Sequence, residues 1–342
     1  MLALRKMGPD PGVALVAAPE PSITQPDEAL IEVAAAGICG SDLHIAHWSA
    51  AFQHLAPFLP VTLGHEFCGR VAARGPTAAI DIGARVTVRP PVSCGRCAAC
   101  RAGDPNACAQ RRSIGLSRDG GFARWVSAPA INCVPAPDSL DDELVALAEP
   151  MAVCLGAVKR AGVAPGERVA ILGPGTIGQG LALFCERAGA GEVAVLGHDD
   201  APRLAVLRAL GFKRLIDGVD PARETALAAL RGAVDCVFEA SGAAGAFETA
   251  FDLARPGGRI VVVGIHAAPV ATDLVRLVRR RLQIIGAFST AAADWPEALA
   301  AIAADPARFA RLITHRFALA EALAGIAVAE RRAASKVMLR PH

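Results

Sequence analysis

The chain has 342 residues, of which 53% are hydrophobic and 20% are charged, and its formal net charge is +2. This length suits two domains, the composition excludes an intrinsically disordered protein, and the absence of tyrosine excludes acid–base chemistry on a tyrosine. The small net charge gives no reason to expect nucleic acid as a partner. Neither a leader-like segment near Met1 nor a bilayer-spanning apolar run is present, so we expect a soluble, cytoplasmic protein with no membrane partner.

The first 130 or so residues are rich in glycine, proline and valine, and they predict a mostly β domain. Short apolar runs between turn residues indicate strands at residues 29–36, 67–73, 85–88 and 122–127. A helical pattern then begins after Ser139 and continues to about Lys159.

From residue 168 onward, apolar runs alternate between strand-like and helical patterns. The predicted strands are residues 169–172, 192–196, 234–238, 259–263 and 282–286. The predicted helices are residues 177–188, 203–210, 222–230 and 244–253. This alternation predicts a doubly wound parallel sheet. Two alanine-rich helices and a terminal strand at residues 335–339 follow, and we expect them to return to the first domain.

Four of the ten cysteines are crowded into one short segment with the spacing Cys94-x2-Cys97-x2-Cys100-x7-Cys108. Two-residue spacers let a turning backbone bring sulfurs to one centre, and four thiolates suit tetrahedral zinc. A disulfide framework is typical of short secreted chains instead, and the polar residues between these cysteines are unlike a core segment. We therefore predict a closed, structural zinc site.

A second constellation combines Cys39 and His65, which lie 26 positions apart and each have a neighbouring glycine. Asp42 is placed to hold the outer nitrogen of a ligating histidine, and Glu149 offers a carboxylate near the domain junction. A site with cysteine, histidine and carboxylate ligands leaves one position for water or a substrate oxygen, which is typical of catalytic zinc. Taken alone, this cysteine and histidine would be read as ordinary buried residues.

The third motif is a glycine-rich turn between a predicted strand and a predicted helix, with the sequence Gly173-Pro174-Gly175-Thr176-Ile177-Gly178. In this context the first glycine makes the turn, the second lets a pyrophosphate approach the backbone, and the third allows close helix–strand packing. The free N–H groups of the helix N-terminus then face the anion. The motif predicts a dinucleotide site, the alternative being a turn that merely joins two elements.

These three motifs, in this order, resemble those of the medium-chain zinc-dependent alcohol dehydrogenases, and the resemblance covers essentially the whole chain. Residues 44–48 resemble the L-threonine dehydrogenase branch, and residues 148–150 the polyol (sorbitol) branch. The resemblance implies an α/β protein with three parts: a GroES-like β-rich catalytic domain (residues 1–150), a Rossmann doubly wound parallel sheet domain (151–288), and a C-terminal segment that returns to the catalytic domain (289–342).

The resemblance also implies a set of site residues. Four residues match the ligand positions of the catalytic zinc: Cys39, His65, Glu66 and Glu149. Whether each carboxylate binds zinc directly or through water stays open. Ser41 and His44 match the proton-relay positions, and Asp42 matches the partner of the zinc-bound histidine, whereas Cys154 is expected to be a packing residue. Together with the four-cysteine site, two zinc ions per chain are expected.

For the coenzyme, the resemblance implies NAD or NADP. Beyond the glycine-rich turn, five residues are expected to contact it: His198, Arg203, Ser241, Gly264 and Ile265. The position at which an acid normally selects NAD holds His198. A missing acid beside Arg203 favours NADP, whereas Asp199 and Asp200 would repel a 2′-phosphate, so the choice stays open with the aspartates tilting it toward NAD.

We therefore expect an enzyme that moves a hydride reversibly between a small secondary alcohol or polyol and NAD(P), with the alcohol as its small-molecule partner. One alternative is an L-threonine 3-dehydrogenase, which would need groups for both the ammonium and the carboxylate. Another is a non-catalytic nucleotide-binding protein, which loss of Cys39 or His65 would favour; both are present. The resemblance implies a homotetramer or homodimer.

Overall fold

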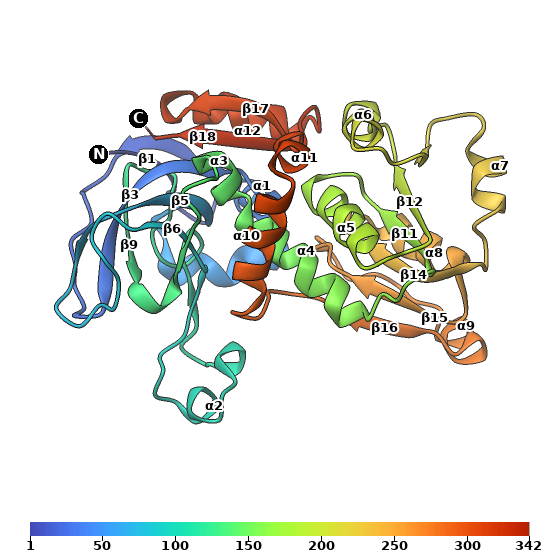
Figure 1. Ribbon diagram of the computed structural model, residues 1–342, viewed down its shortest axis with the longest axis horizontal. Helices are drawn as coiled ribbons and strands as arrows, with labels where there is room; N and C mark the ends of the chain where they lie inside the picture. Colours follow the sequence, from blue (N-terminus) through green and yellow to red (C-terminus); the bar gives the residue numbers. More distant parts are fainter. Residues whose placement is uncertain (342) are drawn as a thin grey trace.

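A computed structural model describes residues 1–341, in which two sheets of different construction lie toward opposite ends of the molecule (Figure 1). The sheet of the first half has the order β10-β6-β5-β3-β18-β17, and β9 also pairs with β3. Its strands are β3 (Glu28–Gly37), β5 (Glu66–Arg74), β6 (Arg85–Val88), β9 (Trp125–Pro129), β10 (Cys133–Pro135), β17 (Ile313–Ala318) and β18 (Lys336–Arg340). A smaller sheet beside it contains β1 (Leu2–Lys6), β2 (Ala14–Ala17) and β4 (Val61–Thr62).

The predicted strands of this half are confirmed, with one shift. β9 begins at Trp125 rather than at residue 122. The backbone of Phe122 is engaged elsewhere, because its N–H donates to the carbonyl of Leu63 and its carbonyl accepts from Leu4, each at 2.9 Å. The segment before β9 therefore joins the smaller sheet to the larger one.

The second half is built on a parallel sheet with the order β13-β12-β11-β14-β15-β16. Its strands are β11 (Arg168–Leu172), β12 (Glu192–Gly197), β13 (Arg214–Asp217), β14 (Val234–Glu239), β15 (Ala254–Val262) and β16 (Gln283–Gly286). The helices between them are α5 (Thr176–Arg187), α6 (Ala201–Ala209), α7 (Arg223–Ala228), α8 (Ala244–Leu253) and α9 (Leu274–Arg280). The expected doubly wound sheet is thus confirmed, although β13 was not among the predicted strands.

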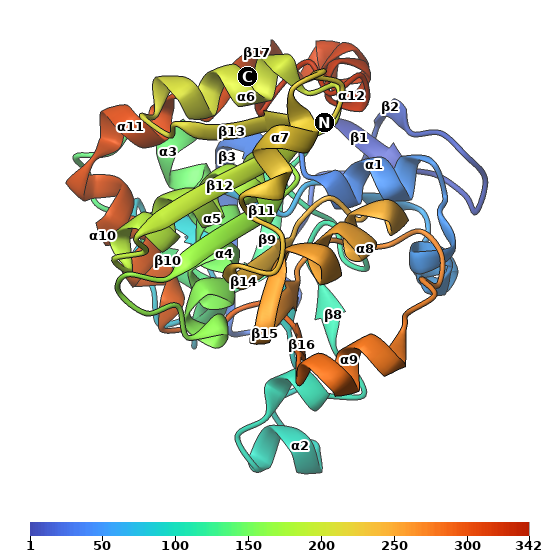
Figure 2. The ribbon, with the colours of Figure 1, turned by 90° about the vertical axis from the view of Figure 1, so that its right-hand side faces the viewer.

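Both faces of this sheet are covered, as Figure 2 shows from the side of the second half. Val169 and Ile171 of β11 lie in the same buried cluster as Leu181 of α5. The alternate residues of the strand, Ala170 and Leu172, belong to a second buried cluster, which contains side chains of α8. This alternation of side chains is the period of two that a strand imposes, and it explains why the strand reads as a continuous apolar run.

The last part of the chain returns to both halves. The helix α10 (Asp294–Ala304) lies beside α4 (Ala148–Ala161), which joins the two sheets, and α11 (Pro306–Ala310) contacts α3 (Asp142–Ala146) (Figure 1). The chain then forms β17, α12 (Ala322–Glu330) and β18 in that order. β18 pairs antiparallel with β3, and β17 pairs parallel with β18. The domain boundaries at residues 150 and 288 stay a prediction. Within residues 1–341 no helix combines the length and apolar character needed to cross a membrane.

A single truncation tests the packing of the parallel sheet. Ile260 of β15 is fully buried in the cluster that α8 covers. Replacing Ile260 with Ala should lower the free energy of unfolding by about 2–5 kcal/mol, because it removes buried methyl groups and leaves a cavity. Ile131, which is 79% exposed, gives the matched control, and Ile131→Ala should change stability by less than about 0.5 kcal/mol. Equal denaturant midpoints for the two variants would contradict this packing.

Candidate active site

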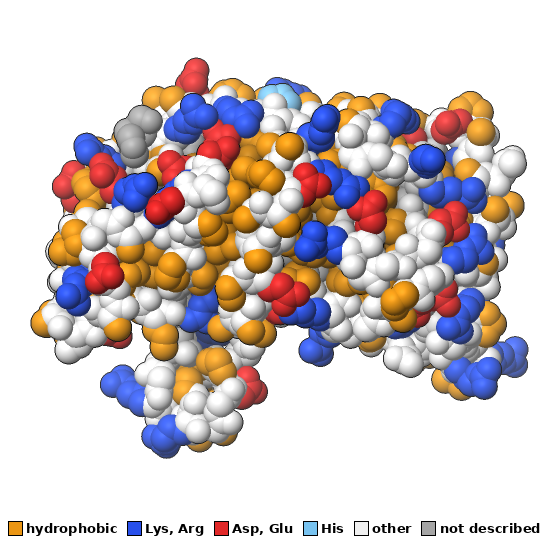
Figure 3. Space-filling view, in the orientation of Figure 1, with side chains coloured by type: hydrophobic (Ala, Val, Ile, Leu, Met, Phe, Trp, Pro, Cys, Tyr) orange, Lys and Arg blue, Asp and Glu red, His pale blue; other side chains and the backbone are white. Residues whose placement is uncertain are grey.

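The four clustered cysteines form a lobe that projects from the body of the molecule (Figures 1 and 3). The short strands β7 (Pro91–Val92) and β8 (Arg112–Ser113) pair at its base, and α2 (Ala98–Arg101) lies within it. Gly95 and Gly103 have φ values of 68° and 83°, a conformation that glycine adopts without strain. These turns let the chain fold back on itself, so that all four sulfurs lie within 4.8 Å of one another.

The geometry of this lobe fits a zinc ion. Neighbouring sulfurs lie 3.5 Å (Cys97–Cys100), 3.6 Å (Cys108–Cys94) and 4.0 Å (Cys94–Cys100) apart. Four sulfurs at a zinc–sulfur distance of about 2.3 Å in a tetrahedron would be about 3.8 Å apart. Backbone N–H groups of Arg96 and Cys97 lower the pKa of Cys94 to about 6, whereas burial and the neighbouring cysteines raise the pKa of Cys100 to about 11. The predicted structural site therefore has donors and a spacing that suit zinc.

A second group of donors converges where β3 and β5 meet. These strands are antiparallel, and Gly37 at the end of β3 lies opposite Glu66 at the start of β5. Cys39 follows β3 and caps α1 (Gly40–Ala46), whereas His65 directly precedes β5. As a result one donor atom each of Cys39, His65 and Glu66 lies within 4.8 Å of the others. The pairing of two strands thus brings together residues that are 26 positions apart in the sequence.

The imidazole of His65 is buried between two side chains of α1. Its Nε2 atom lies 3.5 Å from Oγ of Ser41, and its Nδ1 atom lies 3.9 Å from Oδ1 of Asp42. Among the described residues, Nδ1 of His65 and Oδ1 of Asp42 are both buried without a hydrogen-bond partner. Asp42 is itself fixed, because its other carboxylate oxygen accepts the N–H of Cys39 at 2.9 Å. This arrangement suits a histidine whose Nε2 faces a metal while Nδ1–H faces a carboxylate.

Charge in this cluster is unbalanced. Burial raises the pKa of Asp42 to about 6 and that of Glu149 to about 7. Burial also lowers the pKa of His65, but Cys39, Asp42 and Glu149 outweigh it and raise that pKa well above its usual value. Thiolate, imidazole and carboxylate donors form the set that binds catalytic zinc, and an additional cation would relieve the excess of buried negative charge.

Glu66 has a cationic partner of its own. The ammonium of Lys336, the first residue of β18, forms an ion pair with Oε2 of Glu66 and donates to the carbonyl of Ile38 at 2.9 Å. Both side chains of the ion pair are at most 2% exposed. Gly37 makes room for this pair, because a Cβ atom there would collide with the carboxylate of Glu66. One oxygen of Glu66 is therefore held by Lys336, which leaves the other for the metal site.

Glu149 and His44 lie around this centre. Glu149, in the first turn of α4, stands outside the group formed by Cys39, His65 and Glu66, but it is close enough to raise the pKa of His65.

The ring of His44 stacks on Phe52 with 5.8 Å between ring centroids. Burial and the nearby His47 lower the pKa of His44, so its ring is neutral near pH 7. Cys154 is fully buried and donates to the carbonyl of Ile177, as expected for a packing residue.

The glycine-rich turn leads from β11 into α5. Gly173 has a φ of 108°, and a Cβ atom at Gly178 would collide with the carbonyl oxygen of Gly173. A Cβ atom at Gly175 would meet no atom within 4 Å, so this glycine borders open space. Ile177 packs against the core, and the hydroxyl of Thr176 donates to the carbonyl of Ser335 at 2.8 Å. The turn therefore has a close-packed inner side and an open outer side, where a pyrophosphate fits.

Two consecutive residues, Ser335 and Lys336, connect this turn to the metal-binding centre. Ser335 accepts hydrogen bonds from Thr176 and from Nε2 of Gln179, the latter at 2.6 Å, both from α5. Lys336 holds Glu66. The glycine-rich turn and the carboxylate of Glu66 are thus both held by one short segment at the start of β18.

The other expected coenzyme contacts lie at the carboxyl ends of β14 and β15. Buried Glu239 accepts from the N–H and hydroxyl of Ser241 at 2.8 and 2.6 Å, and its other oxygen lies 3.0 Å from Nε2 of His266. The N–H of Gly264 donates to the carbonyl of Glu239, and the carbonyl of Ile265 lies against Gly242. Glu239 therefore holds two turns together at the strand edge where parallel sheets bind ligands.

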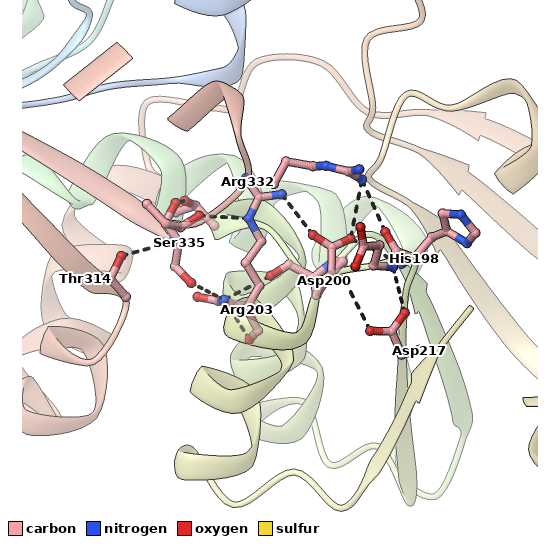
Figure 4. A network of polar contacts seen from close by, with 12 residues as sticks. His198, Asp200, Arg203, Asp217, Thr314, Arg332 and Ser335 are labelled. Carbon is pink, nitrogen blue, oxygen red and sulfur yellow. Dashed lines mark hydrogen bonds and ion pairs between the residues drawn. The ribbon is translucent and has the colours of Figure 1, made fainter. Parts of the chain in front are cut away.

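The loop after β12 carries His198, which is exposed, and the following helix α6 carries Arg203, which is half-buried (Figure 4). The Nε atom of Arg203 donates to the carbonyl of Ala334 at 2.8 Å, and its Nη1 atom lies 3.3 Å from Asp200. Arg203 is thus engaged within the protein.

Sequence patterns did not point to Lys336 or Ser335 as parts of the site. Lys336 lies 270 positions from Glu66, so no local spacing connects them. The one available signal was Lys336 at the start of an apolar strand. A lysine buried there requires a partner of opposite charge, but the sequence does not show which residue that is.

Both halves of the chain are similar to known proteins. Residues 25–138 match the family model described as "Alcohol dehydrogenase GroES-like domain", and residues 176–304 match the model described as "Zinc-binding dehydrogenase". An L-threonine 3-dehydrogenase of Pectobacterium carotovorum subsp. carotovorum (strain PC1) is 30% identical over 342 residues, which are 99% of this chain and 98% of that protein.

Two further proteins are similar over almost their whole length. A sorbitol dehydrogenase of Halalkalibacterium halodurans is 31% identical over 317 residues, covering 91% of each protein. The crystal structure of a zinc-binding dehydrogenase from Sinorhizobium meliloti 1021, bound to NADP, is 33% identical with a TM-score of 0.83 and covers 99% of both chains.

The fold and the two groups of metal donors define an oxidoreductase that uses zinc and a dinucleotide. With both domain models matched and relatives aligned along the chain, the protein belongs to the medium-chain zinc-dependent alcohol dehydrogenase family. This confirms the resemblance that the motifs indicated. It also confirms the expected fold class, a GroES-like domain with a Rossmann sheet.

The buried ion pair of Lys336 and Glu66 gives a test of how the site is held. Lys336→Met should lower the free energy of unfolding by about 3–5 kcal/mol, because it leaves a carboxylate buried without its partner. Adding Glu66→Gln should restore a large part of that loss, since no charge then remains unpaired. Denaturant unfolding of the single and double variants measures both effects. A Lys336→Met variant as stable as the parent would show that the two side chains do not interact in solution.

Proposed function

We propose that this enzyme oxidises a small secondary alcohol or polyol with NAD(P) and catalyses the reverse reduction of the ketone. The observation that carries the proposal is the convergence of Cys39, His65 and Glu66 beside a segment that also fixes the dinucleotide-binding turn. The similarity to a sorbitol dehydrogenase supports a polyol substrate.

Cys39, His65, Glu66 and Glu149 would hold the catalytic zinc, the two carboxylates directly or through water. When bound, zinc polarises the substrate oxygen and lowers its pKa, and the nicotinamide accepts the hydride. Asp42, whose Oδ1 lies 3.9 Å from Nδ1 of His65, would orient the ring and favour the tautomer that carries the proton on Nδ1. Lys336 holds the carboxylate of Glu66 in place. The protein thus supplies a rigid set of donors before the substrate arrives.

The proton released from the alcohol needs a path to solvent. Ser41 lies beside His65, and His44 is one helical turn further along α1. Because the lowered pKa of His44 leaves its ring neutral near pH 7, the ring can accept a proton. Stacking on Phe52 holds it in one position. We assign the outward transfer of the proton to Ser41 and His44.

L-Threonine is a second candidate substrate, because a relative of nearly equal length carries the name L-threonine 3-dehydrogenase. It is a secondary alcohol, so the same metal centre and proton path would serve it. We further propose that the chain forms a homodimer or homotetramer, and that it binds two zinc ions.

A substrate screen with a matched histidine variant tests the reaction. Polyols, 2,3-diols, simple secondary alcohols and L-threonine should be compared with NAD and NADP by following the absorbance of the reduced coenzyme. His65→Ala should reduce kcat on the order of 10³-fold, because it removes a donor of the metal that stabilises developing charge. His315→Ala, which changes a histidine outside this centre, should keep most of the activity. Full activity of His65→Ala would refute the assignment.

Metal content separates the two zinc sites. The parent should contain two zinc ions per chain, and Cys97→Ser should contain one. The melting temperature of Cys97→Ser should fall by about 5 °C or more, because the metal contributes to folding of the lobe. Cys133→Ser, outside the lobe, should keep both ions. Elemental analysis and thermal unfolding give these values, and two ions in Cys97→Ser would contradict the structural site.

A further inference from the structure

The loop between β12 and α6 is folded around the carboxylate of Asp217. This carboxylate accepts the N–H groups of Asp199, Asp200 and Val219 at 2.7, 3.2 and 3.3 Å (Figure 4). It therefore serves the loop itself, and its oxygens point to backbone donors rather than to a ligand.

The carboxylate of Asp200 is also engaged within the protein. It is buried, accepts the N–H of His198 at 3.2 Å and lies 3.3 Å from Nη1 of Arg203. The guanidinium of Arg332 is 3.8 Å from its other side. A carboxylate that selects NAD has to offer both oxygens to the ribose hydroxyls. Neither Asp200 nor Asp217 is placed to do this.

The position that normally carries the selecting acid presents a histidine instead. His198 is exposed, and Figure 4 shows its ring turned away from Asp200 and Asp217. Gly218 lies against this ring, since a Cβ atom at Gly218 would come within 2.5 Å of Nδ1. The loop therefore leaves the imidazole at its surface, where it can donate to an anion.

A cation from the other half of the molecule reaches the same place. Arg332 lies between α12 and β18, and its Nη1 atom donates to the carbonyl of His198 at 3.3 Å. Its side chain is still 51% exposed, so donors of the guanidinium remain accessible beside His198. Figure 4 shows this side chain lying across the loop. The loop at the end of β12 thus presents an exposed imidazole and has an exposed guanidinium against its backbone.

We propose that His198 and Arg332 form a site for the 2′-phosphate of NADP, and that the enzyme binds NADP in preference to NAD. This inference rests on the proposed dinucleotide-dependent function. NAD presents a 2′-hydroxyl that needs an acceptor, whereas NADP presents a dianion that needs donors, and guanidinium groups bind phosphate well. The folded loop offers donors and has its two inner carboxylates engaged. This proposal departs from the tilt toward NAD that Asp199 and Asp200 give in the sequence.

Asp199 is the group that would favour NAD. Its side chain is exposed, and its backbone has the left-handed φ of 54°. If its carboxylate held the ribose, Asp199→Asn would weaken NAD binding about tenfold. Under the proposal, the same variant changes NAD binding by less than about twofold and strengthens NADP binding, because a like charge near the phosphate is removed.

Direct binding, without turnover, tests the proposal on the full zinc-loaded chain. Titration calorimetry with NADP and with NAD should show NADP binding at least about tenfold more tightly. Arg332→Gln should weaken NADP binding about tenfold and leave NAD binding within about twofold, because a charged hydrogen bond to the phosphate is lost. Arg331→Gln removes the same charge one position away and should leave the preference for NADP intact.

The outcomes are distinct. Tighter binding of NAD, or an unchanged NADP affinity in Arg332→Gln, overturns the 2′-phosphate site while leaving the dehydrogenase function standing. Failure of both dinucleotides to bind overturns the proposed function, and this inference with it. A further variant, His198→Asp, should shift the preference toward NAD by restoring an acid at the selecting position; no shift would also count against the site.

Discussion

The ion pair between Lys336 and Glu66 is the interaction on which the site depends. An isolated charge in a protein interior is strongly destabilising, so a buried ammonium and a buried carboxylate must stay together. Lys336 begins β18, and Glu66 begins β5 on the other side of β3. The preceding residue, Ser335, binds the first turn of α5. One electrostatic requirement therefore holds Glu66 and, through the adjacent Ser335, the helix that follows the glycine-rich turn.

The same segment near the end of the chain explains how two differently built halves form one site. Strand pairing brings Cys39 and His65 together, but both belong to the β-rich half. The parallel sheet contributes the turn at Gly173 and has no donor in the group formed by Cys39, His65 and Glu66. The return of the chain toward β18 links them, because Arg332 contacts the loop after β12 and Ser335 contacts α5, while Lys336 contacts Glu66.

Local patterns predicted most of this architecture and much of the site. The alternation of strands and helices predicted the parallel sheet, and the cysteine spacing and glycine turn predicted two groupings that the structure brings together. Patterns missed β13 and β17, because their short and half-buried sequences lack a clear apolar period. They also could not reveal the engagement of Asp200 and Asp217, since hydrogen bonds to backbone groups leave no mark in the sequence.

Anomalous diffraction at the zinc absorption edge, from crystals grown with zinc, is the most direct test of the central claim. The account predicts two peaks per chain. One should lie among Cys39, His65 and Glu66, with Lys336 still paired to Glu66, and the other among the four cysteines of the projecting lobe. A map with no peak beside His65, or with Glu66 turned away from both that position and Lys336, would contradict it.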